Sequence, residues 1–342
     1  MTASPVGVGV IGLGFMGCTH ARAYQAAARA GYPCRLAAVC DPSAEKRSGQ
    51  IAAGGNIATG ESADRLFDAQ NVRGYERPED LLADRSVGLV SICTYTDSHV
   101  DLAIAALNAG KHVLVEKPIA LDSASVRRLA DATRSARTLC MPAMCMRFWP
   151  GWDWLHARIA DRSLGSLRSV TFTRLGSGPT WAGDFYRDLA RSGGALFDLH
   201  IHDTDFVYWC FGRPRTITSV GDGMHVTTLY GFESGPAHVV AEGAWDLAPK
   251  AGFRMRFLAT FERGTAEFDI NRTPWLALHT ASATQDVELP AGTGYDWEIR
   301  HLVEQIAEGS RALRATMDDA VAVAELLELE RAGQTSRAMI SL

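Results

Sequence analysis

The sequence lacks several features that mark other classes of protein. Basic residues do not outnumber acidic ones, and the formal net charge of −5 gives no electrostatic reason to bind nucleic acid or an anionic membrane. No apolar run is long enough to span a bilayer, and the chain has no internal repeat or low-complexity linker. With 47% hydrophobic and 21% charged residues, disorder is excluded as well. What remains is a globular protein whose 342 residues suffice for about two domains.

Cysteine is present, but not in a pattern that suggests disulfides or zinc. The seven cysteines form an odd number without any Cys-x-x-Cys spacing, and several lie within apolar runs. This usage is typical of buried, reduced thiols, so we expect a cytoplasmic protein. The apolar stretch at 6–17 has no Lys or Arg before it, which argues against a signal peptide.

In residues 1–143, short β-branched runs alternate with segments of helical pattern. Strands separated by helices indicate βαβ units and a doubly wound parallel sheet. Ser98 and Asp101 have the spacing of a capping box, which predicts a side-chain cap at the start of a helix. We expect strands at 6–11, 35–40, 87–93, 112–116 and 138–142, and helices at 16–30, 99–109 and 123–136, with a short helix opening at Pro78.

Residues 144–342 have a different character, because turn residues separate many short strand-like runs. This pattern predicts a second α/β domain with a mostly antiparallel sheet and few helices. Thr316 and Asp319 form a second capping-box pattern, before the last long helix. We expect strands at 167–175, 215–220, 224–232, 237–245, 253–261, 265–270 and 275–280, and helices at 298–307 and 318–331.

A Gly-x-Gly-x-x-Gly motif, Gly12–Gly17, lies between the first strand and the first helix. Gly12 permits a tight turn, Gly14 lets the backbone approach a pyrophosphate, and Gly17 lets the helix pack close to the strand. The helix N-terminus then offers N–H groups to the phosphates. We therefore interpret residues 1–143 as a dinucleotide-binding Rossmann domain.

Asp41 follows the second strand, 24 residues after Gly17. Its carboxylate is placed to accept hydrogen bonds from ribose hydroxyls and to repel a 2′-phosphate, so NAD is the favoured cofactor. Lys46 and Arg47 lie close enough in sequence to reach such a phosphate, so NADP stays possible.

The tripeptide Glu116-Lys117-Pro118 ends another predicted strand. Ligands of open parallel sheets bind at the carboxyl ends of the strands, which places Lys117 where cofactor and substrate meet. A desolvated lysine stabilises a developing alkoxide or moves a proton. Taken alone, the tripeptide favours an ordinary surface lysine before a proline turn.

The segment Gly193–Asp205 is dense in histidine and aspartate. If it is helical, Asp198 and His202 are four residues apart on one face, where a carboxylate orients an imidazole for general-base work. If it is a strand, His200 and His202 share a face as a metal pair. The spacing of the neighbouring apolar residues favours the helix, so we expect no metal.

Together these motifs resemble the glucose–fructose oxidoreductase / inositol 2-dehydrogenase (Gfo/Idh/MocA) family. The matching residues lie in the glycine loop, at Asp41, in Ser98-His99, in the run 109–118, in the segment 193–205 and in the C-terminal stretch 318–336. The resemblance implies a Rossmann domain and a domain at 144–342 for substrate binding and oligomerisation. That domain has a large open sheet whose outer face commonly forms a dimer or tetramer interface. It also implies hydride transfer between NAD(P) and a secondary alcohol of a sugar, sugar derivative or cyclitol.

Site residues carried over by position are expectations of the same resemblance. Lys117, Asp198 and His202 are the expected catalytic residues, with His202 as the proton acceptor. Substrate contacts are expected at Arg147, Trp181, Tyr186 and His200, with Asp184 and Arg187 nearby. The expected cofactor contacts are Gly12, Gly14, Phe15, Met16, Gly17, Asp41, Thr94, His99, Glu116 and Lys117.

Three features depart from the family pattern. Tyr95 stands where proline is common, His200 stands where glycine is common, and the stretch 52–71 has no recognisable match. Two other functions also stay open: a glycoside lyase or hydrolase that reduces NAD only transiently, and an NAD-binding sensor without turnover. The presence of Lys117 together with Asp198 and His202 argues against the sensor.

Overall fold

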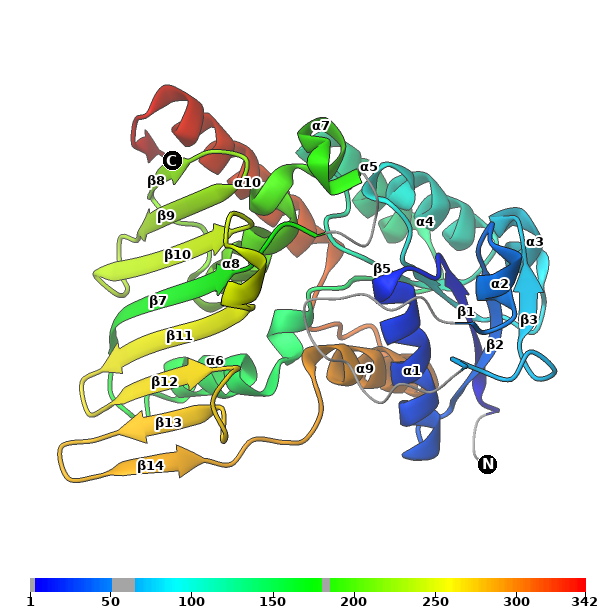
Figure 1. Ribbon diagram of the computed structural model, residues 1–342, viewed down its shortest axis with the longest axis horizontal. Helices are drawn as coiled ribbons and strands as arrows, with labels where there is room; N and C mark the ends of the chain where they lie inside the picture. The colour runs from blue at the N-terminus through cyan, green and yellow to red at the C-terminus, as the bar shows by residue number, and fades with distance from the viewer. Residues whose placement is uncertain (1–3, 51–64, 180–184) are drawn as a thin grey trace. The chain divides into compact units, whose positions relative to one another are not determined.

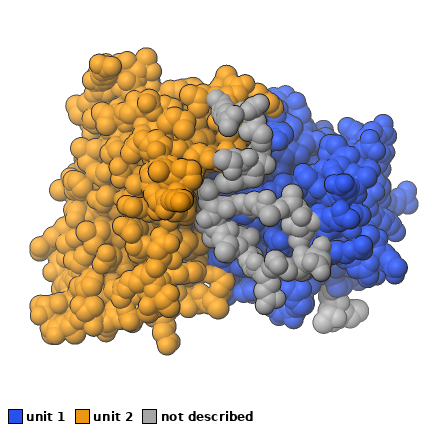
Figure 2. Space-filling model, in the orientation of Figure 1, with its two compact units in different colours: residues 1–145, 293–321 blue, residues 146–292, 322–342 orange. Residues whose placement is uncertain are grey.

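A computed structural model describes residues 4–50, 65–179 and 185–342 of the chain. The chain divides into two compact units, one made of residues 1–145 and 293–321 and the other of residues 146–292 and 322–342 (Figure 2). The sequence placed all of 144–342 in one domain. The structure instead groups 293–321 with the N-terminal residues, because the chain returns to pack a helix there.

The first unit contains a parallel sheet of six strands in the order β3-β2-β1-β4-β5-β6 (Figure 1). This is the doubly wound order of dinucleotide-binding folds, and it confirms the predicted fold class. Burial is nearly complete along β1, as expected for a parallel strand covered on both faces. The strands are β1 (Val6–Ile11), β2 (Cys34–Cys40), β3 (Arg73–Tyr75), β4 (Leu89–Ile92), β5 (His112–Val115) and β6 (Cys140–Pro142).

Helices cover this sheet, and one of them comes from the second half of the sequence. That helix, α9 (Gly294–Glu308), packs on α1 (Phe15–Arg29). It starts four residues earlier than predicted, because Thr293 and Asp296 form a capping box. The remaining helices are α2 (Ala44–Arg47), α3 (Pro78–Ala83), the 3₁₀ turn η1 (Thr96–Ser98), α4 (His99–Asn108) and α5 (Ser123–Ser135).

Of the two capping boxes predicted from sequence, one is wrong and one is confirmed. The Ser98 hydroxyl donates to the Tyr95 carbonyl and contacts the Thr94 hydroxyl, so it does not cap α4. The preceding 3₁₀ turn has rotated it away from the helix. Thr316 and Asp319 do exchange backbone-to-side-chain hydrogen bonds at the start of α10 (Met317–Ser336). That helix begins in the first unit and ends in the second.

The second unit contains a sheet of nine strands in the order β14-β13-β12-β11-β7-β10-β9-β8-β15 (Figure 1). Only the β7–β10 pair is parallel, which confirms the mostly antiparallel sheet. The short edge strands β14 and β15 were not predicted. The strands are β7 (Leu167–Leu175), β8 (Thr216–Gly221), β9 (His225–Gly231), β10 (His238–Ala244), β11 (Arg254–Phe261), β12 (Thr265–Asp269), β13 (Leu276–His279), β14 (Thr284–Val287) and β15 (Ile340–Ser341).

One face of this sheet packs against helices, and the other does not within the described residues. Side chains alternate along β11, so Phe257 is buried whereas Leu258 is 50% exposed. Trp152 of α6 (Pro150–Asp161) lies edge-on to Phe257 and to Phe268. This aromatic cluster forms the core of the unit. Other helical segments are η2 (Cys145–Phe148), η3 (Phe185–Arg187), α7 (Leu189–Ser192), η4 (Leu196–His200), α8 (Ile201–Phe211) and η5 (Pro249–Ala251).

Two further expectations concern cysteine and membranes. All seven cysteines are free thiols, and six of them are buried. This confirms the prediction of reduced thiols. Among the helices in the described ranges, none is both long and apolar enough to cross a bilayer.

Candidate cofactor and catalytic sites

The glycine loop is tight where the fold requires it and open where a ligand would lie. Gly12 has a φ of 87°, and a Cβ on it would lie 2.6 Å from the Cys93 carbonyl oxygen. A Cβ on Gly17 would lie 1.7 Å from the Gly12 carbonyl oxygen, so only glycine lets α1 pack this closely. By contrast, no atom of the described residues lies within 4 Å of a Cβ placed on Gly14. The backbone at Gly14 is therefore accessible to a bulky anionic group.

The α1 N-terminus next to this opening favours an anion. Gly14 is its N-cap residue and supplies no side-chain cap, and no acidic residue lies in the first turn. The positive end of the helix dipole is therefore not neutralised locally. Phe15 and Met16 are half-buried in this turn. These features fit the pyrophosphate of a dinucleotide.

Asp41 is fixed directly beside the loop. Its Oδ2 accepts a hydrogen bond from the Leu13 N–H at 2.8 Å, and its Oδ1 accepts one from the Ser43 N–H at 2.9 Å. Lys46 Nζ lies 3.6 Å from Oδ2, and Arg47 donates to the Asp41 carbonyl oxygen at 2.7 Å. The carboxylate thus follows β2 at the position that recognises a ribose in such folds.

Lys117 follows β5, and the side chain of the preceding residue, Glu116, is held by buried polar groups. Glu116 is 4% exposed, and its Oε2 accepts a hydrogen bond from the Lys117 N–H at 3.1 Å. Its Oε1 lies 3.0 Å from His20 Nε2. The other ring nitrogen of His20 lies 2.7 Å from the Ser91 hydroxyl. A chain of polar contacts therefore connects β4, α1 and the backbone of Lys117.

A second acid completes this buried cluster. Glu298 of α9 is fully buried, and its Oε1 lies 3.9 Å from His20 Nε2. Neither Glu298 oxygen has a hydrogen-bond partner within the described residues, and burial raises the pKa of this carboxyl well above its usual range. Burial also acts to raise the pKa of Glu116, but the contact with His20 and the Lys117 charge outweigh it and lower that pKa. The two acids are thus driven to opposite charge states.

This cluster is also the one arrangement in the described ranges whose ligand atoms converge as a metal site requires. One ligand atom from each of His20, Glu116 and Glu298 lies within 4.8 Å of the others. The 3.0 Å contact between His20 and Glu116 is already a hydrogen-bond distance, and a proton on Glu298 removes the excess negative charge. Protons on these side chains therefore account for the close approach of the three residues.

The residue after Lys117 is held as well. His99 is buried, with Nδ1 2.9 Å from the Pro118 carbonyl oxygen and Nε2 3.0 Å from the Thr94 carbonyl oxygen. Burial lowers the pKa of this imidazole. The ring therefore bridges the loop after β4 and the loop after β5. Lys117 itself is half-buried and projects from a backbone fixed on both sides.

In the second unit, the segment rich in histidine and aspartate is helical, and the strand alternative with a His-x-His metal pair is wrong. Leu196–His200 form a turn of π-helix, η4, which continues directly into α8. Asp198 is half-buried, and His202 is 7% exposed. Short π-helical turns within α-helices are frequent at functional sites. The predicted i, i+4 pair therefore lies on one continuous helical run.

Two buried ion pairs hold α8 in place within the second unit. Arg147 is 1% exposed, and its Nε and Nη2 atoms lie 2.7–3.1 Å from the Asp205 carboxylate. Arg174 of β7 forms a similar pair with Asp203. The Arg147 guanidinium, which we expected at the substrate, is thus engaged inside the unit. Its substrate role stays a prediction.

The other expected substrate residues occupy different environments. Tyr186 packs edge-on against Trp245, with ring centroids 5.2 Å apart. His200 is fully buried, with Nε2 3.0 Å from Glu330 Oε2 of α10. Trp181 and Asp184 lie outside the described residues, as do the Arg187 side chain and residues 52–64 of the unmatched stretch. Tyr95 is 48% exposed.

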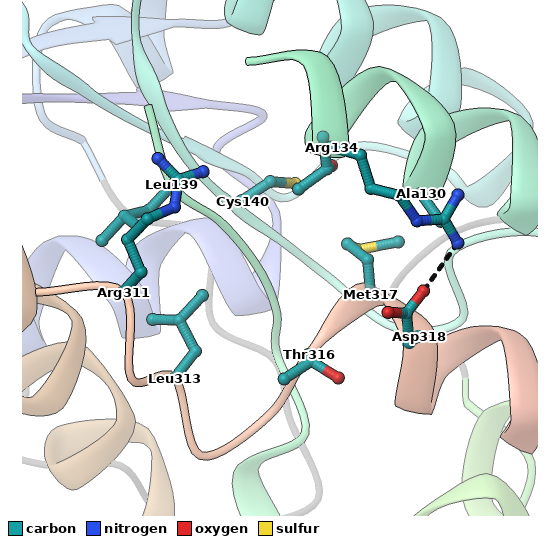
Figure 3. Close-up of a pocket in the computed structure, with 10 residues that line it drawn as sticks. Ala130, Arg134, Leu139, Cys140, Arg311, Leu313, Thr316, Met317 and Asp318 are labelled. Carbon is teal, nitrogen blue, oxygen red and sulfur yellow. Dashed lines mark hydrogen bonds and ion pairs between the residues drawn. The ribbon is translucent and has the colours of Figure 1, made fainter. Parts of the chain in front are cut away.

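A separate cavity of about 330 Å³ in the first unit contains none of the expected site residues. It lies between α5, β6 and the chain that connects α9 to α10, and Arg134 donates to Asp318 at its rim (Figure 3). The negative charges of Asp318 and Asp319 in the first turn of α10 disfavour an anion at the N-terminus of this helix. The cavity therefore has no part in the site described above.

Sequence reasoning missed three buried residues that support the candidate catalytic side chains: His20, Glu298 and Glu330. Their polar side chains occupy positions that α1, α9 and α10 turn towards the protein interior. A charged residue on an otherwise apolar helix face was the available signal. Their partners lie far away in sequence, so the pattern alone did not identify them.

Comparison with known proteins now defines the class. Residues 6–144 match a family described as "Oxidoreductase family, NAD-binding Rossmann fold", and residues 152–267 match the "GFO/IDH/MocA C-terminal domain". The chain therefore has an NAD-binding Rossmann domain of the oxidoreductase type. It belongs to the Gfo/Idh/MocA family, as its motifs indicated.

Two curated relatives illustrate the range of this family. Over 151 residues the chain is 34% identical to trans-1,2-dihydrobenzene-1,2-diol dehydrogenase of Bos taurus, which is 44% of either protein. Over 154 residues it is 30% identical to myo-inositol 2-dehydrogenase of Thermotoga maritima, which is 44% of this chain and 45% of the relative. The matched region thus spans less than half the length of these relatives.

The fold extends over the whole chain. The structure of levoglucosan dehydrogenase in complex with NADH and levoglucosan superimposes with a TM-score of 0.81 and covers 99% of both chains, at 21% identity. At this identity the similarity establishes a common fold.

Proposed function

We propose that this protein is an NAD-dependent dehydrogenase that transfers a hydride between nicotinamide and a secondary alcohol of a sugar, sugar derivative or cyclitol. The observation that carries the proposal is the fixed backbone around Lys117, tied through Glu116 on one side and Pro118 on the other. A backbone fixed in this way sets the point from which the Lys117 side chain projects, which is what a side chain that must meet a reacting atom requires. The relatives named for cyclic diols and polyols support the substrate class.

The proposed roles follow from the chemistry of the three side chains. Bound NAD supplies the oxidising power by accepting the hydride from the carbinol carbon. His202 accepts the hydroxyl proton, and Asp198 orients the His202 imidazole. The carbon–oxygen double bond of the product forms as the hydride and the proton leave the substrate. The Lys117 ammonium stabilises the oxyanion that develops on the substrate oxygen.

The test is turnover with a panel of inositols, aldoses, sugar acids, levoglucosan and trans-dihydrodiols, followed by nicotinamide absorbance. We expect wild-type protein to reduce NAD with one class of substrate. Lys117→Ala and His202→Asn should lower kcat by about a hundredfold or more while NAD still binds, as measured by calorimetry. Tight NAD binding without net reduction, but with conversion of a glycoside, would support the transient-NAD alternative instead. An unchanged kcat in Lys117→Ala would contradict the assigned role.

Cofactor preference is a separate part of the proposal. Asp41 presents a carboxylate already oriented by the glycine loop, and a 2′-phosphate would meet that charge. We expect wild type to prefer NAD over NADP. Asp41→Ser should reduce or reverse the preference, because Lys46 and Arg47 remain beside the site. The ratio of kcat/KM for the two cofactors measures it, and an unchanged ratio would contradict this role.

We also propose that the open face of the nine-stranded sheet binds a second copy of the chain. A row of aligned residues crosses five adjacent strands on this face, and it contains only aliphatic and threonine side chains. It runs through Leu258, Thr171, Val240, Leu229 and Thr218. Leu258 and Leu229 are 50% and 43% exposed, which is costly for a surface that faces only water.

Light scattering tests this surface. Wild type should form a dimer or tetramer, and the pair of substitutions Leu229→Lys and Leu258→Lys should shift it to smaller species. Arg254 lies on the same strand as Leu258 and is already charged, so Arg254→Lys serves as the control. A monomeric wild type would contradict the proposal.

A further inference from the structure

We infer that His200 is a positioning residue: held by Glu330, it fixes the π-helical turn that carries Asp198 and leads into His202. The inference rests on the proposed function, because it assigns those two residues to catalysis. It replaces the expectation that a second imidazole enters the substrate pocket. All of the residues concerned belong to the second unit.

Glu330 is the centre of a buried polar network. It is fully buried on α10, and its Oε1 accepts hydrogen bonds from the Tyr230 hydroxyl at 2.8 Å and the Thr204 hydroxyl at 3.1 Å. Its Oε2 lies 3.0 Å from His200 Nε2 and 3.3 Å from the Thr228 hydroxyl. A buried carboxylate is tolerated when its lone pairs are satisfied in this way. The network therefore ties η4, α8 and β9 to a single side chain.

Space for the imidazole is built into the sheet. Gly243 of β10 faces His200, and a Cβ placed on Gly243 would lie 3.0 Å from the His200 Cβ and 3.3 Å from its Nδ1. A side chain at this strand position would therefore crowd His200, which would have to shift to make room. Glycine at position 243 thus leaves room for the imidazole of His200.

The contacts also indicate which ring nitrogen donates. His200 Nδ1 is buried and has no hydrogen-bond partner within the described residues, whereas Nε2 lies 3.0 Å from Glu330 Oε2. A buried donor without an acceptor is costly, so a proton is better placed on Nε2 than on Nδ1. The network therefore assigns Nε2–H as the donor to Glu330.

The position of His200 explains why this contact matters for catalysis. It is the last residue of the π-helical turn, two residues after Asp198 and two before His202. A π-helical turn is less favourable than an α-helical one and persists only when its surroundings hold it. Without the anchor, the turn is free to relax towards α-helix, which rotates Asp198 relative to His202.

The experiment compares three substitutions. Glu330→Leu keeps the volume but removes every acceptor, and we expect kcat to fall about tenfold to a hundredfold while the NAD dissociation constant is unchanged. Glu330→Gln retains an amide oxygen for His200, and the hydroxyl groups of Tyr230 and Thr204 can accept from its amide nitrogen, so it should restore most of kcat. Ser219→Ala is the control, since Ser219 contacts Thr228 but not Glu330.

A second measurement does not depend on turnover. In protein labelled with ¹⁵N-histidine, the His200 signals should show a proton on Nε2 that is hydrogen-bonded to Glu330, and Glu330→Leu should shift the His202 signal as well. Tyr230→Phe, which removes one donor and keeps the shape, provides a milder variant if Glu330→Leu does not fold. If no substrate is turned over but these signals behave as stated, the anchor stands and the proposed function fails.

Three results would overturn the inference. One is a His200 ring whose Nε2 carries no proton in the wild-type protein. Another is Glu330→Leu with unchanged kcat and an unchanged His202 signal. The third is His200→Gln that raises KM for the alcohol while kcat and the His202 signal stay the same, since that pattern identifies a substrate contact.

Discussion

Each unit of this protein buries a histidine against glutamate, and the two clusters solve the same electrostatic problem differently. In the second unit, Glu330 is surrounded by the ring of His200 and three hydroxyl groups. In the first, His20 contacts Glu116 at 3.0 Å and Glu298 only at 3.9 Å, and no described residue donates to Glu298. One buried acid has its lone pairs satisfied, and the other is left without donors.

Burial alone therefore does not determine how a carboxyl group behaves inside a protein. A carboxylate that accepts several hydrogen bonds can remain charged there, whereas one without donors takes up a proton. The cluster in the first unit carries its charge on Glu116, next to Lys117, because burial raises the pKa of Glu298. In the second unit, the hydrogen bonds converge on Glu330.

The greatest change in the free energy of unfolding is predicted for a variant that tests this contrast directly. Glu330→Leu leaves a buried imidazole N–H and three hydroxyls without their acceptor, and should lower the free energy of unfolding by about 3–5 kcal/mol. Glu298→Leu removes an acid that has no donors, so stability should stay unchanged or rise. Urea unfolding followed by circular dichroism measures both. Glu325→Leu, on α10 but outside the network, should change stability by less than about 1 kcal/mol. Equal losses at Glu330 and Glu298 would contradict the contrast.

The second prediction concerns pH. The unfolded chain releases the Glu298 proton above about pH 4.5, whereas the folded chain retains it because burial raises the folded pKa. Stability contributed by this group is therefore complete below pH 4.5 and declines as pH rises, by up to about 1.4 kcal/mol per pH unit. Glu298→Gln should remove this decline. The melting temperatures of both proteins between pH 5 and 8 test it, and parallel curves would show that Glu298 is ionised in the folded protein.

A third, smaller effect distinguishes the two imidazoles. Nδ1 of His20 lies 2.7 Å from the Ser91 hydroxyl, whereas Nδ1 of His200 has no hydrogen-bond partner among the described residues. Ser91→Ala should cost about 1–2 kcal/mol, because it leaves one nitrogen of a buried ring unpaired. Val90 is also buried on β4, so Val90→Ala separates the loss of the hydrogen bond from the loss of volume. A wild-type-like urea midpoint for Ser91→Ala would mean that Nδ1 of His20 carries no proton.

The smallest effect comes from an exposed counterpart. His225 is held between Asp246 at 2.9 Å and Glu242 at 3.1 Å on the open sheet face, and these carboxylates raise its pKa although partial burial opposes them. Its contribution is complete below pH 6.5 and disappears as pH rises through the folded pKa. Because solvent screens the pair, His225→Asn should cost less than about 1 kcal/mol at pH 5.5 and nothing at pH 9. A larger loss that persists at pH 9 would indicate a packing role.

Local patterns in the sequence were sufficient for most of the fold. Strand–glycine–helix spacing predicted the loop at Gly12–Gly17, and alternation predicted β7 at its observed ends. The helical spacing of apolar residues correctly favoured a helix over a metal-binding strand around His202. The sequence missed α6 and the start of α9, since a helix that begins at Pro150 or Thr293 is fixed by capping and packing more than by periodicity.

The sequence by itself determined the architecture, the glycine loop and the position of Lys117 at the end of a parallel strand, because each depends on residues close together in the chain. Which buried acids receive hydrogen bonds, by contrast, depends on the tertiary structure. Glu298 reaches His20 and Glu330 reaches His200 from helices more than a hundred residues away. The charge of a buried group depends on the number of donors that the fold brings to it, and no local pattern contains that number.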